Sequence, residues 1–200
     1  NDYEWKKNFM LKWDDLSKEL IAIQFNDVFK YGYEFITSQR IQIITPQYEK
    51  CQSALSLTLA KNYGGILFGP SGVGKTEMIK DLAKSLGYYY VVISCGNSIT
   101  TLQMGSLFRG IVQSGCFCCL QEMQRLSDET LSVADWHLSI IRQATLAGLK
   151  KFYFDSYEIQ LNSSYCFFGT VSSKESLSIP NHIKDYFRPI SIAEINEEQI

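Results

Sequence analysis

The sequence predicts an α/β fold in which helices cover both faces of a parallel β-sheet. From position 48 onward, short apolar runs alternate with segments of helical spacing, and repeated strand-helix units of this kind form parallel sheets. A glycine-rich turn, Gly69 to Thr76, joins one apolar run directly to a helical segment. The chain has 200 residues, of which 46% are hydrophobic, and this is enough for a substantial core.

The N-terminal residues have a different pattern from the rest of the chain. Residues 1–28 place large apolar side chains among many charges, and we expect them to form an appendage that leads into a domain over residues 29–200. Arg40 to Pro46 then has the composition of a short extended piece that Pro46 ends or turns. Tyr48 to Lys61 has helical spacing and begins the alternation of helices and strands.

The remaining elements follow in order along the chain. They are strand Ile66 to Phe68, helix Lys75 to Leu86, strand Tyr88 to Ser94, helix Thr101 to Ser114, strand Cys116 to Leu120, a helix through Leu131 and Ile141, a hairpin over Phe152 to Leu161, strand Tyr165 to Thr170, and strand Ile190 to Ile192. Gly87 is suited to end the helix that starts at Lys75, and Ser127 can cap the helix that contains Leu131 and Ile141. In the helix Thr101 to Ser114, the side chains expected to point inward are Leu102, Leu107, Phe108 and Ile111.

The overall charge argues against two classes of partner. With 19 basic and 21 acidic residues, the formal net charge of −2 provides no strong positive field to collect nucleic acid or anionic lipid. No apolar stretch approaches the roughly 18 residues needed to span a bilayer. The sequence starts without an initiator Met or a signal-peptide profile, so we expect an excerpt from a longer protein.

The six cysteines are best interpreted as buried free thiols in a reducing compartment. They are Cys51, Cys95, Cys116, Cys118, Cys119 and Cys166, and several of them lie in apolar runs. A zinc site at Cys116 to Cys119 is the alternative. It is disfavoured because a strand would place Cys118 and Cys119 on opposite faces, and because His137 and His182 lack ligand spacing.

The glycine-rich turn matches the phosphate-binding pattern G-x-x-x-x-G-K-[ST]. It reads Gly69-Pro70-Ser71-Gly72-Val73-Gly74-Lys75-Thr76. The glycines let backbone N–H groups point inward, Lys75 can reach the β- and γ-phosphates, and the Thr76 hydroxyl can ligate Mg²⁺. The alternative is a purely structural turn, but the strand before it and the helix after it favour a nucleotide site.

A site of this kind needs carboxylates at the end of a neighbouring strand to support Mg²⁺ and the attacking water. The best candidate is the end of the run that contains Cys118 to Glu122, where Gln121 stands in place of the usual Asp. An amide adds no negative charge, and weakened metal support of this kind costs about 10- to 100-fold in affinity or activity. Glu122 is placed to act as general base, although a solvated carboxylate at a strand end is the alternative.

Several strings together resemble one family. They are Phe29 to Phe35, Ile43 to Pro46, Gly69 to Thr76 with Glu77 following, Lys80 to Lys84, Gly105, Phe108 to Gly110, Gln113 to Gly115, Glu122 with Arg125, Leu131 to Val133, and Ile179-Pro180 through Phe187-Arg188-Pro189. Over roughly residues 25–195, the chain resembles the first AAA+ module of a dynein heavy chain. The appendage before it resembles the end of the dynein linker.

The resemblance implies the P-loop NTPase fold of an AAA+ large subdomain, without the helical lid that normally closes over the nucleotide. It implies that ATP and Mg²⁺ bind between this module and the next one in a ring, and that turnover drives linker motion. Ile44, Thr45 and Pro46 would lie beside the adenine, and Glu77 would belong to the nucleotide site. Arg188 resembles an Arg that points toward an adjacent module, although a surface role is equally compatible with the sequence.

The resemblance also implies partners and a location. The neighbouring AAA+ modules of the same chain would contact this one directly. The parent protein would bind microtubules and dynein intermediate and light chains, with no nucleic acid and no membrane. We therefore expect the protein in the cytoplasm and cytoskeleton, with the ciliary axoneme as a further location.

The chain departs from the family around the γ-phosphate position. Besides Gln121, this chain has Thr170 where the family has a polar sensor Asn, and Gln124 where the family has an Asn after the acidic pair. The Gly-Arg that follows the sensor strand in the family aligns with Glu175-Ser176. We expect Glu122 and Thr170 to be the catalytic residues and Thr76 and Gln121 to support the metal. These departures suggest the hypothesis that phosphate binding is retained while hydrolysis is weakened or lost.

Three functions remain open from the sequence. The first is a catalytic motor module, and the second is a structural module that nucleotide rigidifies without useful turnover. The third is a small-molecule P-loop kinase, which needs an acceptor site and an Arg-rich lid; we find neither after residue 110.

Overall fold

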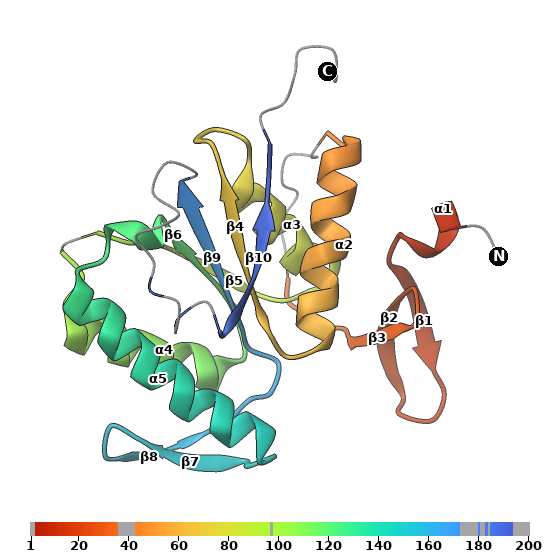
Figure 1. Cartoon of the computed structure of the whole chain (residues 1–200). Helices are drawn as coiled ribbons and strands as arrows, with labels where there is room; N and C mark the ends of the chain where they lie inside the picture. The colour runs from red at the N-terminus through yellow and green to blue at the C-terminus, as the bar shows by residue number, and fades with distance from the viewer. Residues whose placement is uncertain are drawn as a thin grey trace.

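The computed structural model describes residues 3–35, 43–96, 98–172, 180, 183 and 185–193. Its centre is a five-stranded sheet with the strand order β10-β4-β9-β6-β5, in which every neighbouring pair is parallel (Figure 1). The strands are β4 (Gly64–Gly69), β5 (Tyr90–Ser94), β6 (Phe117–Gln121), β9 (Cys166–Ser172) and β10 (Phe187–Ser191). The predicted α/β class with a parallel sheet is confirmed.

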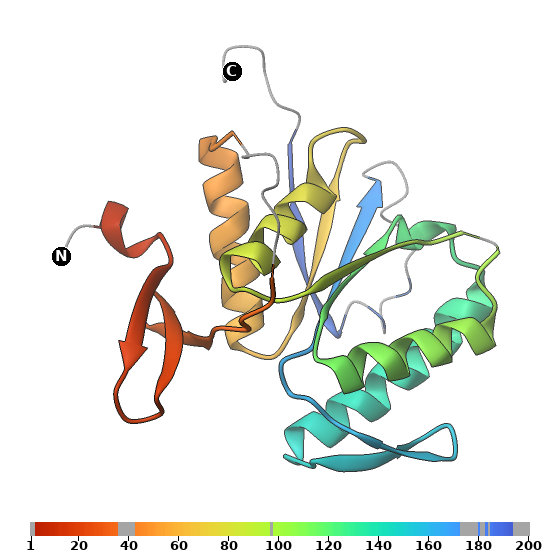
Figure 2. The same cartoon turned by 180° about the vertical axis from the view of Figure 1, so that it is seen from behind.

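Long helices cover both faces of the sheet, as both views show (Figures 1 and 2). They are α2 (Pro46–Ala60), α3 (Lys75–Ser85), α4 (Thr101–Ser114) and α5 (Asp128–Leu146), with a 3₁₀ turn at Met123–Arg125. Leu55 of α2 and Ile79 of α3 pack in one buried cluster, whereas Phe108 of α4 and Ile141 of α5 pack in another. The sheet therefore separates two cores.

Strand β6 shows how the sequence supplies both cores. Cys118 and Leu120 belong to the cluster under α4 and α5, while Phe117 and Cys119 belong to the cluster under α2 and α3. This is the alternation that the sequence predicts for a strand. All six cysteines are free and buried, and no metal-binding group of His, Cys, Asp or Glu occurs among the described residues. His182 lies outside them.

The predicted hairpin is present as β7 (Lys151–Phe154) and β8 (Tyr157–Gln160). Its apolar side chains pack into the core under α4 and α5. At its turn, Asp155 lies 3.0 Å from Nε2 of the buried His137 on α5. Gly105 of α4 faces this pair closely, since a Cβ there would meet Asp155 Oδ2 at 2.8 Å. The hairpin is thereby fixed across both helices.

The N-terminal residues form a small antiparallel sheet of their own. After a short helix, α1 (Tyr3–Lys6), strands β1 (Met10–Asp14), β2 (Glu19–Gln24) and β3 (Asp27–Lys30) pair in sequence order. Position 28 lies inside β3, so the boundary expected there falls within a strand. This sheet is attached to the end of α3, because Gly32 N–H donates to Leu86 O at 2.9 Å and Glu34 N–H donates to Gly87 O at 2.8 Å.

Three local expectations need correction. The helix expected from Tyr48 begins at Pro46, directly after the extended N-cap residue Thr45, because a proline at the first helical position lacks only an N–H that would be unpaired anyway. Leu102 is 83% exposed, because it lies off the buried stripe of α4 that Met104 and Phe108 share. Strand β5 starts at Tyr90, not at Tyr88. Residues 40–42 of the expected extended piece lie outside the described residues.

The cap at Ser127 is confirmed, since its side chain accepts from Thr130 N–H ahead of α5. In the part of the chain that the structure describes, no helix is both long enough and apolar enough to span a bilayer.

Candidate nucleotide site

The phosphate loop connects the carboxyl end of β4 to the first residue of α3. Gly72 and Gly74 have φ angles of 88° and 83°, in the left-handed region that residues with side chains rarely adopt. Gly74 is the N-cap of α3 and provides no side-chain cap. The first N–H groups of α3 are therefore left for a ligand, and a helix N-terminus of this kind favours an anion such as phosphate.

A cavity of about 240 Å³ lies at this helix N-terminus. Its lining residues are Ser71, Gly72, Gly74, Lys75, Thr76, Glu77, Gln121, Glu122, Thr170 and Ser172. The sheet order explains the gathering, because β9 lies between β4 and β6 and all three carboxyl ends meet at one edge. The phosphate loop and the predicted residues Gln121, Glu122 and Thr170 thus share one cavity.

Lys75 lies folded over its own loop. Its ammonium group donates to Gly69 O at 2.8 Å and to Pro70 O at 2.6 Å. Partial burial lowers the pKa of Lys75, and the nearby carboxylate of Glu122 acts in the opposite direction. The ammonium group has only neutral hydrogen-bond acceptors here, so an anionic phosphate would be a stronger partner.

Gln121 is the last residue of β6 and is anchored on both its backbone and its side chain. Its carbonyl accepts from Cys95 N–H at 2.8 Å, and its side-chain oxygen accepts from Ser94 Oγ at 3.4 Å. The amide lies in the cavity next to the loop that carries the Thr76 hydroxyl. It can accept a hydrogen bond from a metal-bound water, but it brings no negative charge to the metal.

Glu122 has a left-handed backbone, with φ 58° and ψ 51°, at the point where β6 ends. Its N–H donates to Thr170 Oγ1 at 3.1 Å, and its carboxylate pairs with Arg125 Nε at 2.9 Å. Thr170 is buried on β9 and uses its hydroxyl oxygen to hold this turn. Thr170 therefore positions the Glu122 backbone, in addition to the expected role toward water.

Some predicted site residues do not line the cavity. Ile44 is 69% exposed, and Thr45 caps α2 through Tyr48 N–H, with Pro46 following it. Helix α2 begins at the same end of the sheet as the phosphate loop (Figure 1). Val73 is half-buried against the core under α2 and α3.

Two further sequence expectations concern charged residues near the site. Glu77 lines the cavity, but its carboxylate pairs with Lys80 at 2.6 Å. Arg188 is exposed on the edge strand β10, a position compatible with contact to a neighbouring module. Glu175 and Ser176 lie outside the described residues.

The residues present fit a nucleoside triphosphate better than they fit a metal ion alone. The open N-terminus of α3, Lys75 and the Thr76 hydroxyl form a cradle for phosphate oxygens. For Mg²⁺, the described residues offer the Thr76 hydroxyl and the Gln121 amide but no cluster of carboxylates. Oxygen ligands for Mg²⁺ would therefore have to come mainly from the phosphates and water.

The family follows from comparison with known proteins. A family model described as the hydrolytic ATP binding site of the dynein motor region matches residues 31–200. The chain belongs to the dynein heavy chain family. Dynein axonemal heavy chain 2 of Mus musculus is 34% identical over 194 residues, which cover 96% of this chain and 4% of the relative.

Dynein relatives from distant organisms are equally similar. The dynein-1-beta heavy chain of the flagellar inner arm I1 complex of Chlamydomonas reinhardtii is also 34% identical over 194 residues, covering 96% of this chain. The dynein module spans only 4% of the length of that relative. The Thermotoga maritima RuvB Holliday junction branch migration motor shares the fold alone, with a TM-score of 0.54, 18% identity, and coverage of 76% of this chain and 46% of that structure.

In this dynein module the structure adds site residues that the sequence reasoning missed. Ser172 lines the cavity two residues beyond Thr170 on the same face of β9, which the period of a strand could have indicated. Ser94 contacts Gln121 from the neighbouring strand β5. Arg125 belongs to a string shared with the family, but its contact with Glu122 depends on the turn at Met123–Arg125, which the string does not reveal.

Proposed function

We propose that this chain binds ATP with Mg²⁺ as the hydrolytic AAA+ module of a dynein heavy chain, and that turnover in the parent protein drives movement along microtubules. The observation that carries the proposal is the cavity that joins the phosphate loop with Gln121, Glu122 and Thr170. The family description of a hydrolytic ATP site supports it independently.

In this proposal, the N–H groups of the phosphate loop and the Lys75 ammonium hold the phosphates. Thr76 ligates Mg²⁺, and Gln121 supports its water shell; the bound ion would neutralise charge on the phosphates. Glu122 acts as general base toward water, once its carboxylate leaves Arg125. Ile44, Thr45 and Pro46 lie beside the adenine, and Glu77 stands at the edge of the phosphate site.

A second candidate function has two observations in its favour. Gln121 stands where an Asp is usual, so the metal site has one negative charge fewer, and the Glu122 carboxylate is paired with Arg125. A module with these features can bind nucleotide and stabilise the ring while turning it over slowly. Hydrolysis is then weakened, and the module is mainly structural.

The proposed domain division and partners follow from the same function. Residues 1–28 form the end of a linker-like appendage and residues 29–200 the ATP-binding domain. Neighbouring AAA+ modules of the same chain complete the site, and intermediate and light chains join the parent protein. Because several relatives are named as axonemal or flagellar dyneins, the cytoskeleton of a cilium is the proposed location.

The experiment is photo-labelling of the parent heavy chain with a photo-reactive ATP analogue, followed by mapping of the labelled peptides. Labelling within residues 1–200 should be lost in Lys75→Ala and kept in Lys84→Ala, which removes a lysine from the last turn of the same helix. Unchanged labelling in Lys75→Ala would exclude this nucleotide site.

The two candidate functions are separated by a second variant, Glu122→Gln. If the module is catalytic, steady-state phosphate release attributable to it should fall by about 10²- to 10⁴-fold, because a general base contributes about that much. Unchanged phosphate release with normal labelling would select the structural function.

A further inference from the structure

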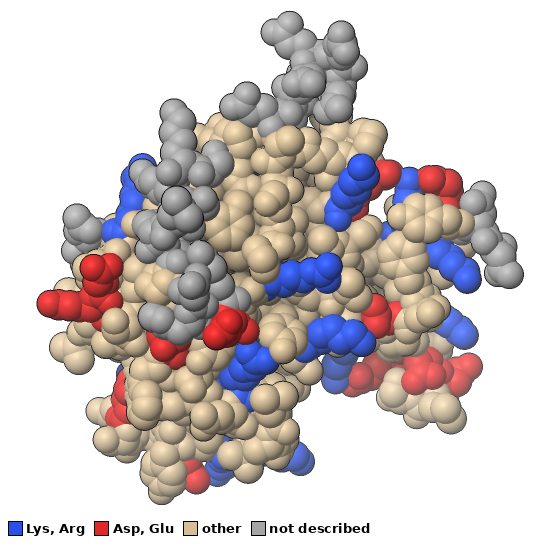
Figure 3. Space-filling model, viewed as in Figure 1, with Lys and Arg blue, Asp and Glu red and all other residues tan. Residues whose placement is uncertain are grey.

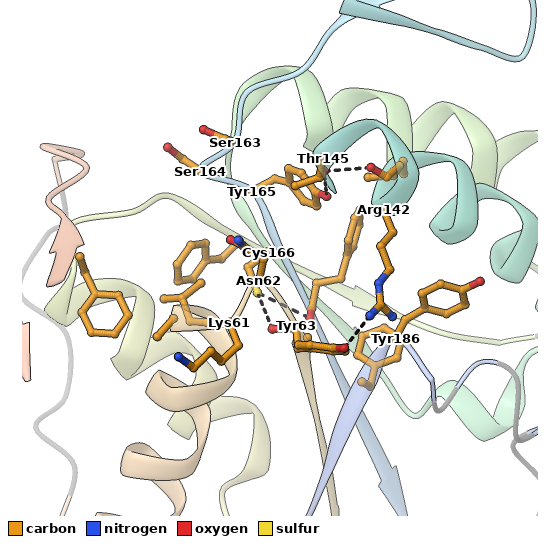
Figure 4. Close-up of a pocket in the computed structure, with 18 of the residues that line it drawn as sticks. Lys61, Asn62, Tyr63, Arg142, Thr145, Ser163, Ser164, Tyr165, Cys166 and Tyr186 are labelled. Atoms are coloured by element: carbon orange, nitrogen blue, oxygen red, sulfur yellow. Dashed lines mark hydrogen bonds between the residues drawn. The ribbon is translucent and has the colours of Figure 1, made fainter. Parts of the chain in front are cut away.

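A second cavity lies at the end of the sheet opposite the phosphate loop (Figure 4). It has a volume of about 350 Å³, and its floor is formed where strands begin, at Gly64, Phe117, Cys166 and Phe187. Its walls come from β3, from the turn between α2 and β4, and from the C-terminal half of α5. None of its lining residues belongs to the nucleotide site.

The described lining of this cavity contains cations and no carboxylate. The cations are Lys30, Lys61 and Arg142. Lys30 is already paired with Glu19 at 2.9 Å, whereas Lys61 and Arg142 form no ion pair with the described residues. Lys and Arg side chains gather between the core and the N-terminal sheet on this face (Figure 3). Among the described residues, Lys61 and Arg142 thus bring positive charge to the opening with no carboxylate paired to them.

Arg142 is held in one orientation by neutral groups. Its guanidinium donates to Tyr63 Oη at 2.6 Å and to Asp185 O at 2.8 Å. It also lies over the Tyr63 ring, 4.5 Å from the ring centroid, with the Tyr186 ring at 5.7 Å (Figure 4). Because these contacts order the guanidinium without neutralising it, a carboxylate can bind it at a small additional cost in side-chain entropy.

The rim of the cavity is apolar as well as positive. Val28 of β3 is 61% exposed and Leu146 of α5 is 73% exposed, and the Tyr63 ring also belongs to the lining. A small polar ligand would leave this apolar surface in water. A polypeptide that carries both an acidic and a large apolar side chain would cover it.

We propose that this cavity is the docking site for a segment of the parent heavy chain that carries a carboxylate beside a large apolar side chain. The carboxylate would pair with Arg142 and Lys61, and the apolar side chain would fill the space above the strand ends. This inference rests on the proposed function, in which the module is part of a heavy chain such as the relative of which it spans 4%, so that the rest of that chain can present such a segment at high effective concentration. Docking would hold the N-terminal sheet against the core, because β3 forms one wall.

The test uses the intact heavy chain with a photo-reactive phenylalanine analogue in place of Leu146. Irradiation followed by mass spectrometry should give a crosslink to a segment of the same chain outside residues 1–200, with Asp or Glu next to a large apolar residue. The crosslink yield should fall by about 1.5- to 5-fold in Lys61→Glu and in Arg142→Gln, since each removes an ion pair near the surface. Lys150→Gln removes an exposed lysine outside the cavity and should leave the yield unchanged.

Three results would overturn the proposal. They are a yield no higher than that from the same analogue in place of the exposed Leu102, a crosslink to a different protein, and a crosslink that Lys61→Glu and Arg142→Gln leave unchanged. Lys61 is exposed at the end of α2, so its variant tests the charge even if Arg142→Gln disturbs the packing of the two tyrosine rings. ATP photo-labelling in the same samples reports on the nucleotide site separately.

Discussion

The Glu122 carboxylate pairs with Arg125, whose Nε lies 2.9 Å from Glu122 Oε2. Glu122 caps a single 3₁₀ turn that follows β6, and Arg125 is the last residue of that turn. Glu122 N–H also donates a hydrogen bond to Thr170 Oγ1. The backbone of Glu122 is thus fixed to the sheet, while its carboxylate is turned to a partner other than a nucleophilic water.

Arg125→Gln should free that carboxylate and raise ATP turnover. Exposed ion pairs are worth about 0.2–1 kcal/mol, so we expect an increase in kcat of about 1.5- to 5-fold with little change in nucleotide affinity. Steady-state phosphate release from the parent heavy chain measures it. Arg109→Gln, which removes an arginine stacked on Tyr157 away from the site, is the matched control. A decrease in kcat would show that Arg125 assists Glu122.

Gln121→Asp should restore the missing charge at the metal site. We expect nucleotide binding to become more dependent on Mg²⁺ by about 10- to 100-fold, measured as the ratio of affinities with Mg²⁺ and with EDTA. Gln113→Glu adds one negative charge on the exposed side of α4 and should leave that ratio unchanged. An identical ratio in Gln121→Asp would show that position 121 does not support the metal.

Gly105→Ala should destabilise the fold. The new Cβ would lie 2.8 Å from Asp155 Oδ2 and 3.0 Å from His137 Cε1, and overpacking of this kind costs about 1–3 kcal/mol. Gly110→Ala on the same helix meets nothing within 4 Å and should stabilise by about 0.5–1 kcal/mol through helix propensity. Denaturant unfolding of both variants checks the opposite signs, and equal effects would contradict the close packing at Gly105.

The buried thiols should be inert in the folded protein. Burial raises the pKa of Cys95 and of Cys119 to about 12, from an ordinary value of 9.0. At pH 8 the folded thiolate fraction is then about one in ten thousand, against about one in ten after unfolding. Alkylation with iodoacetamide at pH 8 should therefore follow denaturant unfolding, and rapid labelling of the native protein would contradict the burial.

The same pKa shifts determine how the free energy of unfolding changes with pH. Because the folded pKa values are raised, the stabilisation is complete below pH 9 and is lost as the pH rises toward 12. Unfolding experiments under reducing conditions between pH 8 and pH 11 should show this decline. Replacement of Cys119 by Ala should reduce its slope.

How far the sequence predicts the structure depends on how local each feature is. The cap at Ser127 and the opposite faces of Cys118 and Cys119 follow from spacing alone, and the structure confirms them. Leu102 is exposed because it lies two residues before Met104, on another side of the helix from the buried stripe, and an apolar residue alone does not reveal which stripe faces the sheet. The three-stranded N-terminal sheet depends on pairing between separate segments, which no single segment encodes.

The candidate site divides in the same way. The phosphate loop is one continuous string, so its place was predictable from the pattern. The contacts of Glu122 with Arg125 and Thr170, and the place of Ser172 in the lining, arise only when β6 and β9 lie side by side. The sequence identified which residues matter there but not which partners hold them.

Helix α3 has a mechanical consequence. It starts at Lys75 in the phosphate loop, and just beyond its other end the carbonyls of Leu86 and Gly87 accept the N–H groups of Gly32 and Glu34. At 1.5 Å per residue, its 11 residues make a rigid rod about 16 Å long. A single rigid element therefore connects the phosphate loop to the segment that leaves the N-terminal sheet.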